Sequence, residues 1–128
     1  MNRYFLHNLN NSLNEVEVFH YVDDIFKSKK QIFIDDISDH ISSDSEIFYF
    51  IPSSKLSSVK LDTSPDDSDE TIRAKLLSEM DNFIVSDISE NEIFVHRNSK
   101  LNLAILINKD YLSSLTKKLR ATGSKIYI

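Results

Sequence analysis

The residues that could do chemistry are scattered along this chain. Its four histidines lie far apart: His7, His20, His40 and His96. None belongs to the H-x-x-x-H pair with which one helix holds zinc, so the sequence predicts no metal site. The adjacent aspartates Asp23-Asp24 and Asp35-Asp36 would suit acid–base chemistry if folding brought the two pairs together. Aspartates that follow strands more commonly form turns, and the sequence therefore predicts no catalytic residue set.

The acidic segment Asp62 to Glu70, DTSPDDSDE, raises the question of calcium binding. It lacks the glycine and the ordered ligand spacing of an EF-hand loop, which favours a solvated lead-in to a helix. The only glycine in the chain is Gly123, and one glycine cannot build a phosphate-binding loop or a nucleophile elbow. We therefore expect no ATP binding and no cofactor, and the default interpretation is an interaction module.

Composition is that of a single domain of ordinary size. The chain has 128 residues, a hydrophobic content of 41%, a formal net charge of −5 and no cysteine. No apolar run is long enough to span a membrane, and the lack of cysteine favours a reducing, cytoplasmic setting. The acidic balance argues against nucleic acid as a partner. We expect one domain over residues 1–128.

The most apolar run, Leu101 to Ile107, predicts a strand around which the other elements can be organised. Asn108 can cap a following helix, and Gly123 falls where a left-handed C-cap is needed. Three leucines recur at helical spacing between them: Leu112, Leu115 and Leu119. Lys125 to Ile128 then predicts another strand, and strand, helix, strand indicates a crossover unit. We expect these leucines to pack over one sheet face, with Leu103, Ile105 and Ile107 buried.

Other segments predict further strands and one more long helix. The expected strands are Tyr4–Leu9, Val16–Val22, Gln31–Ile37, Glu46–Ile51, Ser57–Leu61 and Ile93–Val95. The expected helix runs from Ser68 to Val85, with Asp66 or Ser68 as its cap. A short helical turn is expected between Ile37 and Ser43. The fold class is therefore α/β, with α+β as an alternative, built on a mixed sheet with two main helices.

From Ile47 to Ile128 the chain resembles a known family. Three segments carry the resemblance in the family's order: EIFYFIPSSKLSSVKL from Glu46, MDNFIVSDI from Met80, and KLNLAILINKDYLSSLTKKLRATGSKIYI from Lys100. They are similar to the cytoplasmic actin-like domain of the type II secretion system inner-membrane protein L, the GspL family, which is related to pilus assembly protein M. The resemblance implies an actin-like, RNase H-like subdomain.

The resemblance also implies a non-enzymatic scaffold. Such domains recruit the N-terminal domain of the secretion ATPase, a GspE-like protein, to other inner-membrane platform proteins. This chain would then lie at the inner-membrane face through a missing or partner membrane segment. On the Ser68–Val85 helix we expect a partner-binding face made of Arg73, Lys75, Ser78, Glu79, Asp81 and Asn82. Two alternatives stay open: a small acidic binding protein of the inhibitor or immunity type, and a small aspartate-dependent enzyme.

Overall fold

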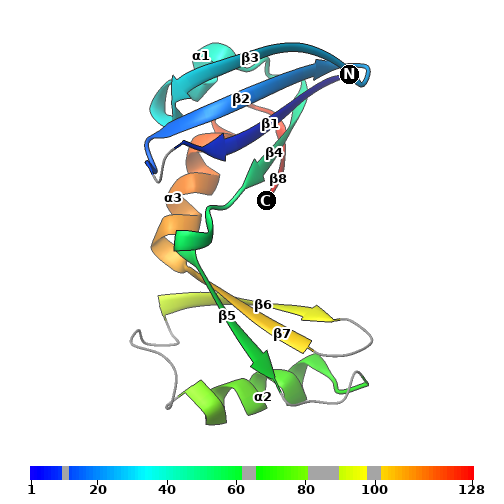
Figure 1. Cartoon of the computed structure of the whole chain (residues 1–128), viewed down its shortest axis with the longest axis vertical. Helices are drawn as coiled ribbons and strands as arrows, with labels where there is room; N and C mark the ends of the chain where they lie inside the picture. The colour runs from blue at the N-terminus through cyan, green and yellow to red at the C-terminus, as the bar shows by residue number, and fades with distance from the viewer. Residues whose placement is uncertain (10–11, 62–65, 81–89, 98–101) are drawn as a thin grey trace. The chain divides into compact units, whose positions relative to one another are not determined.

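A computed structural model describes residues 1–9, 12–61, 66–80, 90–97 and 102–128 of the chain (Figure 1). The chain divides into two compact units. Unit 1 comprises Met1–Ser54 with Ser113–Ile128, and unit 2 comprises Lys55–Leu112. That residues 1–128 fold together as one domain stays a prediction. Within the described ranges, no helix is both long enough and apolar enough to cross a membrane.

Unit 1 is built on a five-stranded mixed sheet with the strand order β3-β2-β1-β4-β8. The strands are β1 (Asn2–Asn8), β2 (Glu15–Val22), β3 (Ile25–Phe33), β4 (Ser45–Phe50) and β8 (Lys125–Tyr127). β1, β2 and β3 pair antiparallel, whereas β4 runs parallel to β1 and β8 runs parallel to β4. The predicted mixed sheet is confirmed.

A two-residue turn joins β2 to β3 and uses the first aspartate pair. Asp23 and Asp24 have φ angles of 49° and 66°, the left-handed conformation that such hairpin turns require and that aspartate tolerates. The N-terminal ammonium group forms an ion pair with the Asp23 carboxylate, and this hydrogen bond lowers the pKa of Asp23. The prediction that this aspartate pair forms a turn is confirmed.

The third strand begins six residues earlier than the sequence predicted. A strand was expected over Gln31–Ile37, but β3 occupies Ile25–Phe33 and is followed by a 3₁₀ turn, η1 (Ile34–Asp36), and a short helix, α1 (Ile37–His40). Three lysines between positions 27 and 30 hide the strand signal. They are acceptable here because β3 is an edge strand, where charged side chains discourage pairing with other chains.

One face of this sheet forms the core of unit 1. Its buried residues from the strands are Tyr4, Leu6, Val16, Val18, Ile32, Ile47 and Tyr49. The helical segments contribute Ile34, Ile37, Leu115 and Leu119, and Ile41 directly follows α1. Figure 1 shows α1 and the unit 1 part of α3 (Lys109–Arg120) on this side of the sheet. The predicted packing of Leu115 and Leu119 over a sheet face is confirmed, whereas Leu112 is only half-buried.

The ends of α3 are the ones that the sequence predicted. The side-chain oxygen of Asn108 accepts a hydrogen bond from the backbone N–H of Tyr111 at 3.0 Å, which is N-cap geometry. Gly123 has a φ of 77°, and its N–H donates to the carbonyl of Arg120 at 3.0 Å. A Cβ at position 123 would meet Cβ of Ser43 at 3.4 Å, an ordinary contact, so it is the backbone conformation that favours glycine there.

Unit 2 contains a three-stranded antiparallel sheet with the order β5-β7-β6. Its strands are β5 (Leu56–Leu61), β6 (Asn91–Arg97) and β7 (Asn102–Asn108); a short 3₁₀ turn, η2 (Ser53–Lys55), precedes β5. Helix α2 (Asp69–Met80) lies against β5, and its Ile72 is fully buried. Ser68 Oγ accepts a hydrogen bond from the N–H of Thr71 at 3.2 Å, which confirms the expected cap. The predicted residues Asp81–Val85 lie outside the described residues.

The predicted crossover unit is wrong. β7 pairs with β5 and β6 in unit 2, whereas β8 pairs with β4 in unit 1, so α3 does not connect two strands of one sheet. The short connection between β6 and β7 favours an antiparallel hairpin over a parallel pairing. Along β7, Ile107 is buried as predicted, together with Ala104 and Leu106. Leu103 and Ile105 are only half-buried, because they point to the face opposite Ala104 and Leu106.

Candidate interaction surface

The second face of the unit 1 sheet carries a row of aromatic side chains that crosses all five strands. The row consists of Phe26, Tyr21, Phe5, Phe48 and Tyr127, one each from β3, β2, β1, β4 and β8. Successive ring centroids lie 5.5, 5.5, 4.9 and 4.7 Å apart along it. These are the separations of attractive aromatic pairs, so the rings form one continuous row.

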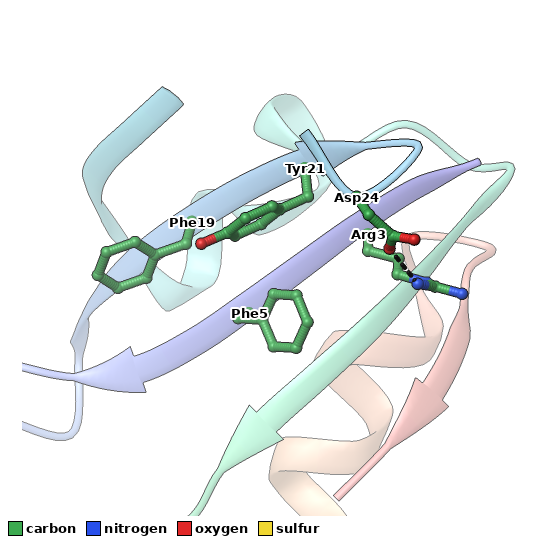
Figure 2. Close-up of a pocket in the computed structure, with 5 residues that line it drawn as sticks. All are labelled: Arg3, Phe5, Phe19, Tyr21 and Asp24. Carbon is green, nitrogen blue, oxygen red and sulfur yellow. Dashed lines mark hydrogen bonds and ion pairs between the residues drawn. The ribbon is translucent and has the colours of Figure 1, made fainter. Parts of the chain in front are cut away.

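Two further rings extend the row into what we call the aromatic face. Phe50 lies 6.5 Å from Phe5, and Phe19 pairs with Phe5 across β1 and β2. Figure 2 shows Phe5, Phe19 and Tyr21 on the same side of the sheet, around a shallow hollow of about 400 Å³ that Arg3 and Asp24 also line. Phe50 and Phe26 are 58% and 52% exposed. An exposed aromatic surface of this extent is a candidate site for binding another molecule.

Charged side chains lie among the rings of the aromatic face. Arg3 donates hydrogen bonds to Glu46 at 3.0 Å and to Asp24 at 2.6 Å, the second of which is drawn in Figure 2. These two carboxylates raise the pKa of Arg3, with the hydrogen bond to Glu46 as the largest cause. Glu17 lies at hydrogen-bond distance from Nε2 of His7, 3.2 Å, and forms an ion pair with Lys29 at 3.5 Å.

Two lysines lie over rings at the edges of the sheet. The ammonium nitrogen of Lys29, on β3, lies 5.9 Å from the Phe19 ring centre. That of Lys125, on β8, lies 5.2 Å from the Tyr127 ring centre. Both distances are within the range of cation–π attraction, which holds the positive charge close to the apolar surface.

The partner-binding face that the sequence placed on α2 is described only in part. Arg73 is exposed, and Lys75 is half-buried and forms an ion pair with Asp67 at 3.3 Å. Ser78 and Glu79 fall within α2, whereas Asp81 and Asn82 lie outside the described residues. The role of these six residues in binding stays a prediction.

The aspartate pairs are not brought together. Asp23-Asp24 precedes β3 and Asp35-Asp36 follows it, so the nine residues of this strand separate the pairs by roughly 30 Å. Asp35 instead forms an ion pair with Lys118 of α3 at 2.8 Å. Among the described residues, no group of three or more histidine, aspartate or glutamate side chains is placed to hold a metal ion.

One histidine is part of the buried side of the sheet. The His20 ring stacks on Tyr4 with 4.4 Å between ring centres, and its Nε2 is 2.8 Å from the side-chain oxygen of Asn2. Burial lowers the pKa of His20, and the positive charges of Lys30 and Lys27 lower it further. These contacts indicate a structural role for this histidine.

The sequence interpretation missed the aromatic face, although a signal was present. In FLH from Phe5, FHY from Phe19 and FYF from Phe48, aromatic residues occur at every second position. Of the residues between them, Leu6 and Tyr49 are buried on the helix-covered side and His20 is half-buried there. A strand that is apolar on both faces is normally covered on both. That pattern could have predicted a second apolar surface.

The fold is similar to that of a solved secretion-system domain. No protein-family model and no curated protein sequence matches the chain. Among solved structures, the chain matches the cytoplasmic domain of EpsL, an inner-membrane component of the type II secretion system of Vibrio cholerae, with a TM-score of 0.78 and 10% sequence identity. The match covers 99% of this chain and 56% of that domain, so the chain spans a little over half of its length. This similarity confirms the predicted fold class.

Proposed function

We propose that this chain is a non-enzymatic docking domain of a type II secretion or type IV pilus-like inner-membrane platform. In this role it lies on the cytoplasmic side and recruits the N-terminal domain of a GspE-like secretion ATPase. The observation that carries the proposal is the similarity of fold, over nearly the whole chain, to the cytoplasmic domain of EpsL.

The arrangement of side chains favours a scaffold over the aspartate-dependent enzyme. A general acid and a general base must both reach one substrate, and the two aspartate pairs lie at opposite ends of β3. Each described pair also has a structural role: Asp23 and Asp24 form a turn, and Asp35 pairs with Lys118.

We place the ATPase-binding surface on the exposed side of α2. Arg73 and Lys75 supply cations there, and the ion pair of Lys75 with Asp67 is only partly buried. The sequence adds Ser78, Glu79, Asp81 and Asn82 to the proposed binding residues. A surface of both charge signs suits an assembly contact, because complementary charges select the partner.

The test is a double charge reversal on α2. Arg73→Glu with Lys75→Glu should weaken co-purification with the N-terminal domain of the secretion ATPase about tenfold or more, as reversal of close interface charges does. The thermal melt should change little, because an ion pair that keeps part of its surface in solvent contributes only about 0–1 kcal/mol.

A matched control changes two exposed lysines elsewhere in unit 2. Lys60→Glu with Lys109→Glu makes the same change in net charge on β5 and at the start of α3. This variant should retain binding. Equal loss in both variants would indicate a general charge effect, and intact binding in the α2 variant would remove that surface from the proposal.

A further inference from the structure

We propose that the aromatic face of unit 1 binds an amphipathic helix of a partner protein whose flanks carry aspartate and glutamate. The binding surface is centred on Phe5 of β1, with Lys29 and Lys125 at its two sides. This inference goes beyond the proposed function, because it concerns a different surface in the other unit and does not depend on ATPase recruitment.

The layer structure of unit 1 indicates a helix as the occupant. Sheets that are apolar on both faces are normally covered by helices on both. Here α1 and α3 cover the face that forms the core, whereas within the described residues of unit 1 no helix covers the aromatic face (Figure 1). A helix supplied by a partner would complete the same three-layer arrangement.

The area of the aromatic face is sufficient for such a contact. Its three most exposed rings are Phe26, Phe50 and Tyr127, and with aromatic side chains of 150–250 Å² each they expose roughly 300 Å². The half-buried rings Phe5, Phe19, Tyr21 and Phe48 add to this. The hollow beside Phe5 offers a place for an anchoring side chain. Contiguous apolar patches of this size on soluble proteins commonly mark interaction sites.

The accessible cations on the strands of this face are Arg3, Lys29 and Lys125, and one accessible carboxylate, Glu15, lies at the start of β2. Lys29 is 54% exposed while its partner Glu17 is 10% exposed, and Arg3 is 39% exposed while Glu46 is 16% exposed. These two carboxylates therefore lie beneath the cations, and a partner meets ammonium and guanidinium groups first. Asp24, which is well exposed, lies in the turn at one end.

This arrangement favours an acidic helix over a second copy of the chain. Two copies packed through this face would bring their exposed cations together across an apolar contact, which costs free energy. A helix with carboxylates on its flanks would instead form charge-assisted hydrogen bonds. The face thus selects its partner by charge as well as by apolar area.

The positions of the two lysines fit one helix laid over the central strand. β1 has two strands on each side, so Lys29 on β3 and Lys125 on β8 each lie about 10 Å from it in the plane of the sheet. A helix is about 10–12 Å in diameter with its side chains. Carboxylates on its two flanks would reach both lysines while its apolar stripe covers Phe5 and Phe48.

The test uses two designed peptides and the intact protein. Each peptide has 18 residues, with leucine at helical spacing on one face; the acidic peptide carries glutamate on both flanks and the basic peptide carries lysine. Fluorescence anisotropy should detect binding of the acidic peptide, with the basic peptide binding at least about tenfold more weakly. In NMR spectra of the unmodified protein, the shift changes should map to the aromatic face.

Variants at exposed positions locate the contact. Phe26→Ser with Phe50→Ser should weaken binding of the acidic peptide at least about tenfold, because these rings contribute the most exposed apolar area. Phe94→Ser, a comparable change at a 48%-exposed phenylalanine in β6, is the matched control and should bind normally. Lys29→Gln with Lys125→Gln should reduce both the affinity and its dependence on salt, whereas Lys60→Gln should not.

Any of the following results would overturn the proposal. Equal binding of both peptides would show that the aromatic face does not select its partner by charge. Chemical-shift changes that map to unit 2 would show that the peptide binds elsewhere. If the folded protein does not bind the acidic peptide, the proposal is also wrong. If sedimentation shows a dimer that Phe26→Ser with Phe50→Ser makes monomeric, the occupant is a second copy instead. None of these results bears on the α2 charge reversal, so the two proposals fail separately.

Discussion

The two faces of the unit 1 sheet come from the same strands and have different chemistry. In β2, Val16 and Val18 are fully or nearly fully buried on the helix-covered side, whereas Phe19 and Tyr21 lie on the aromatic face. Successive side chains of a strand point to opposite faces, so one eight-residue segment contributes to both. Alternate positions of one strand can therefore serve different purposes, because one set stabilises the fold while the other forms an exposed surface.

The kind of apolar residue differs between the faces for a physical reason. Branched aliphatic side chains such as Leu6 and Ile47, both at 0% exposure, fill a closed core to high density. Flat rings such as Phe5 and Phe48 stack on one another and stay half-buried. The aliphatic side should therefore dominate the free energy of unfolding, and the aromatic side should dominate binding.

The largest expected effect is on the aliphatic side. Leu115→Ala removes a buried side chain of α3 and should lower the free energy of unfolding by about 2–5 kcal/mol, the usual cost of such a cavity. Chemical denaturation measures this change. A value near zero would mean that α3 does not stabilise the sheet. The proposal that the helix-covered side dominates the free energy of unfolding would then be wrong.

A pH-dependent effect is expected at His20, on the same side. Its folded pKa lies below the ordinary value of 6.5, so the unfolded chain binds the proton more readily. Stability should therefore fall as pH drops through 6.5 and should level off below the folded pKa. His20→Gln should flatten this part of the profile in thermal melts between pH 8 and pH 5.

The control for His20 is His96→Gln, which makes the same change at an exposed position of β6. It should keep the pH dependence of the unmodified protein. If His20→Gln also keeps it, burial does not disfavour the charged ring, and the stacking on Tyr4 has no electrostatic consequence.

The smallest effect on stability is expected on the aromatic side. Phe50→Ser changes a ring that is 58% exposed and should alter the free energy of unfolding by no more than about 0.5 kcal/mol, as surface substitutions usually do. The same denaturation experiment measures it beside Leu115→Ala. A loss comparable to that of Leu115→Ala would show that the aromatic face is part of the core after all.

Several local features follow from the sequence by itself. Asn108, Ser68 and Gly123 end or begin their helices where the sequence predicted, because caps depend on hydrogen bonds within a few residues. The Asp23-Asp24 turn is equally local, since two residues of left-handed backbone are enough to reverse the chain. The position of most strands and the mixed α/β class follow from the alternation of apolar residues.

Tertiary structure decided which strands pair and which surfaces stay open. β7 and β8 lie in different sheets although one helix links them, because partner choice depends on strands far away in sequence. The lysine-rich start of β3 becomes a strand only through its pairing with β2. Tertiary structure also decided that the aromatic face, and not the opposite one, is left uncovered by the helices of unit 1. The alternation in β1, β2 and β4 shows two apolar faces, but only long-range packing determines which of them the helices cover.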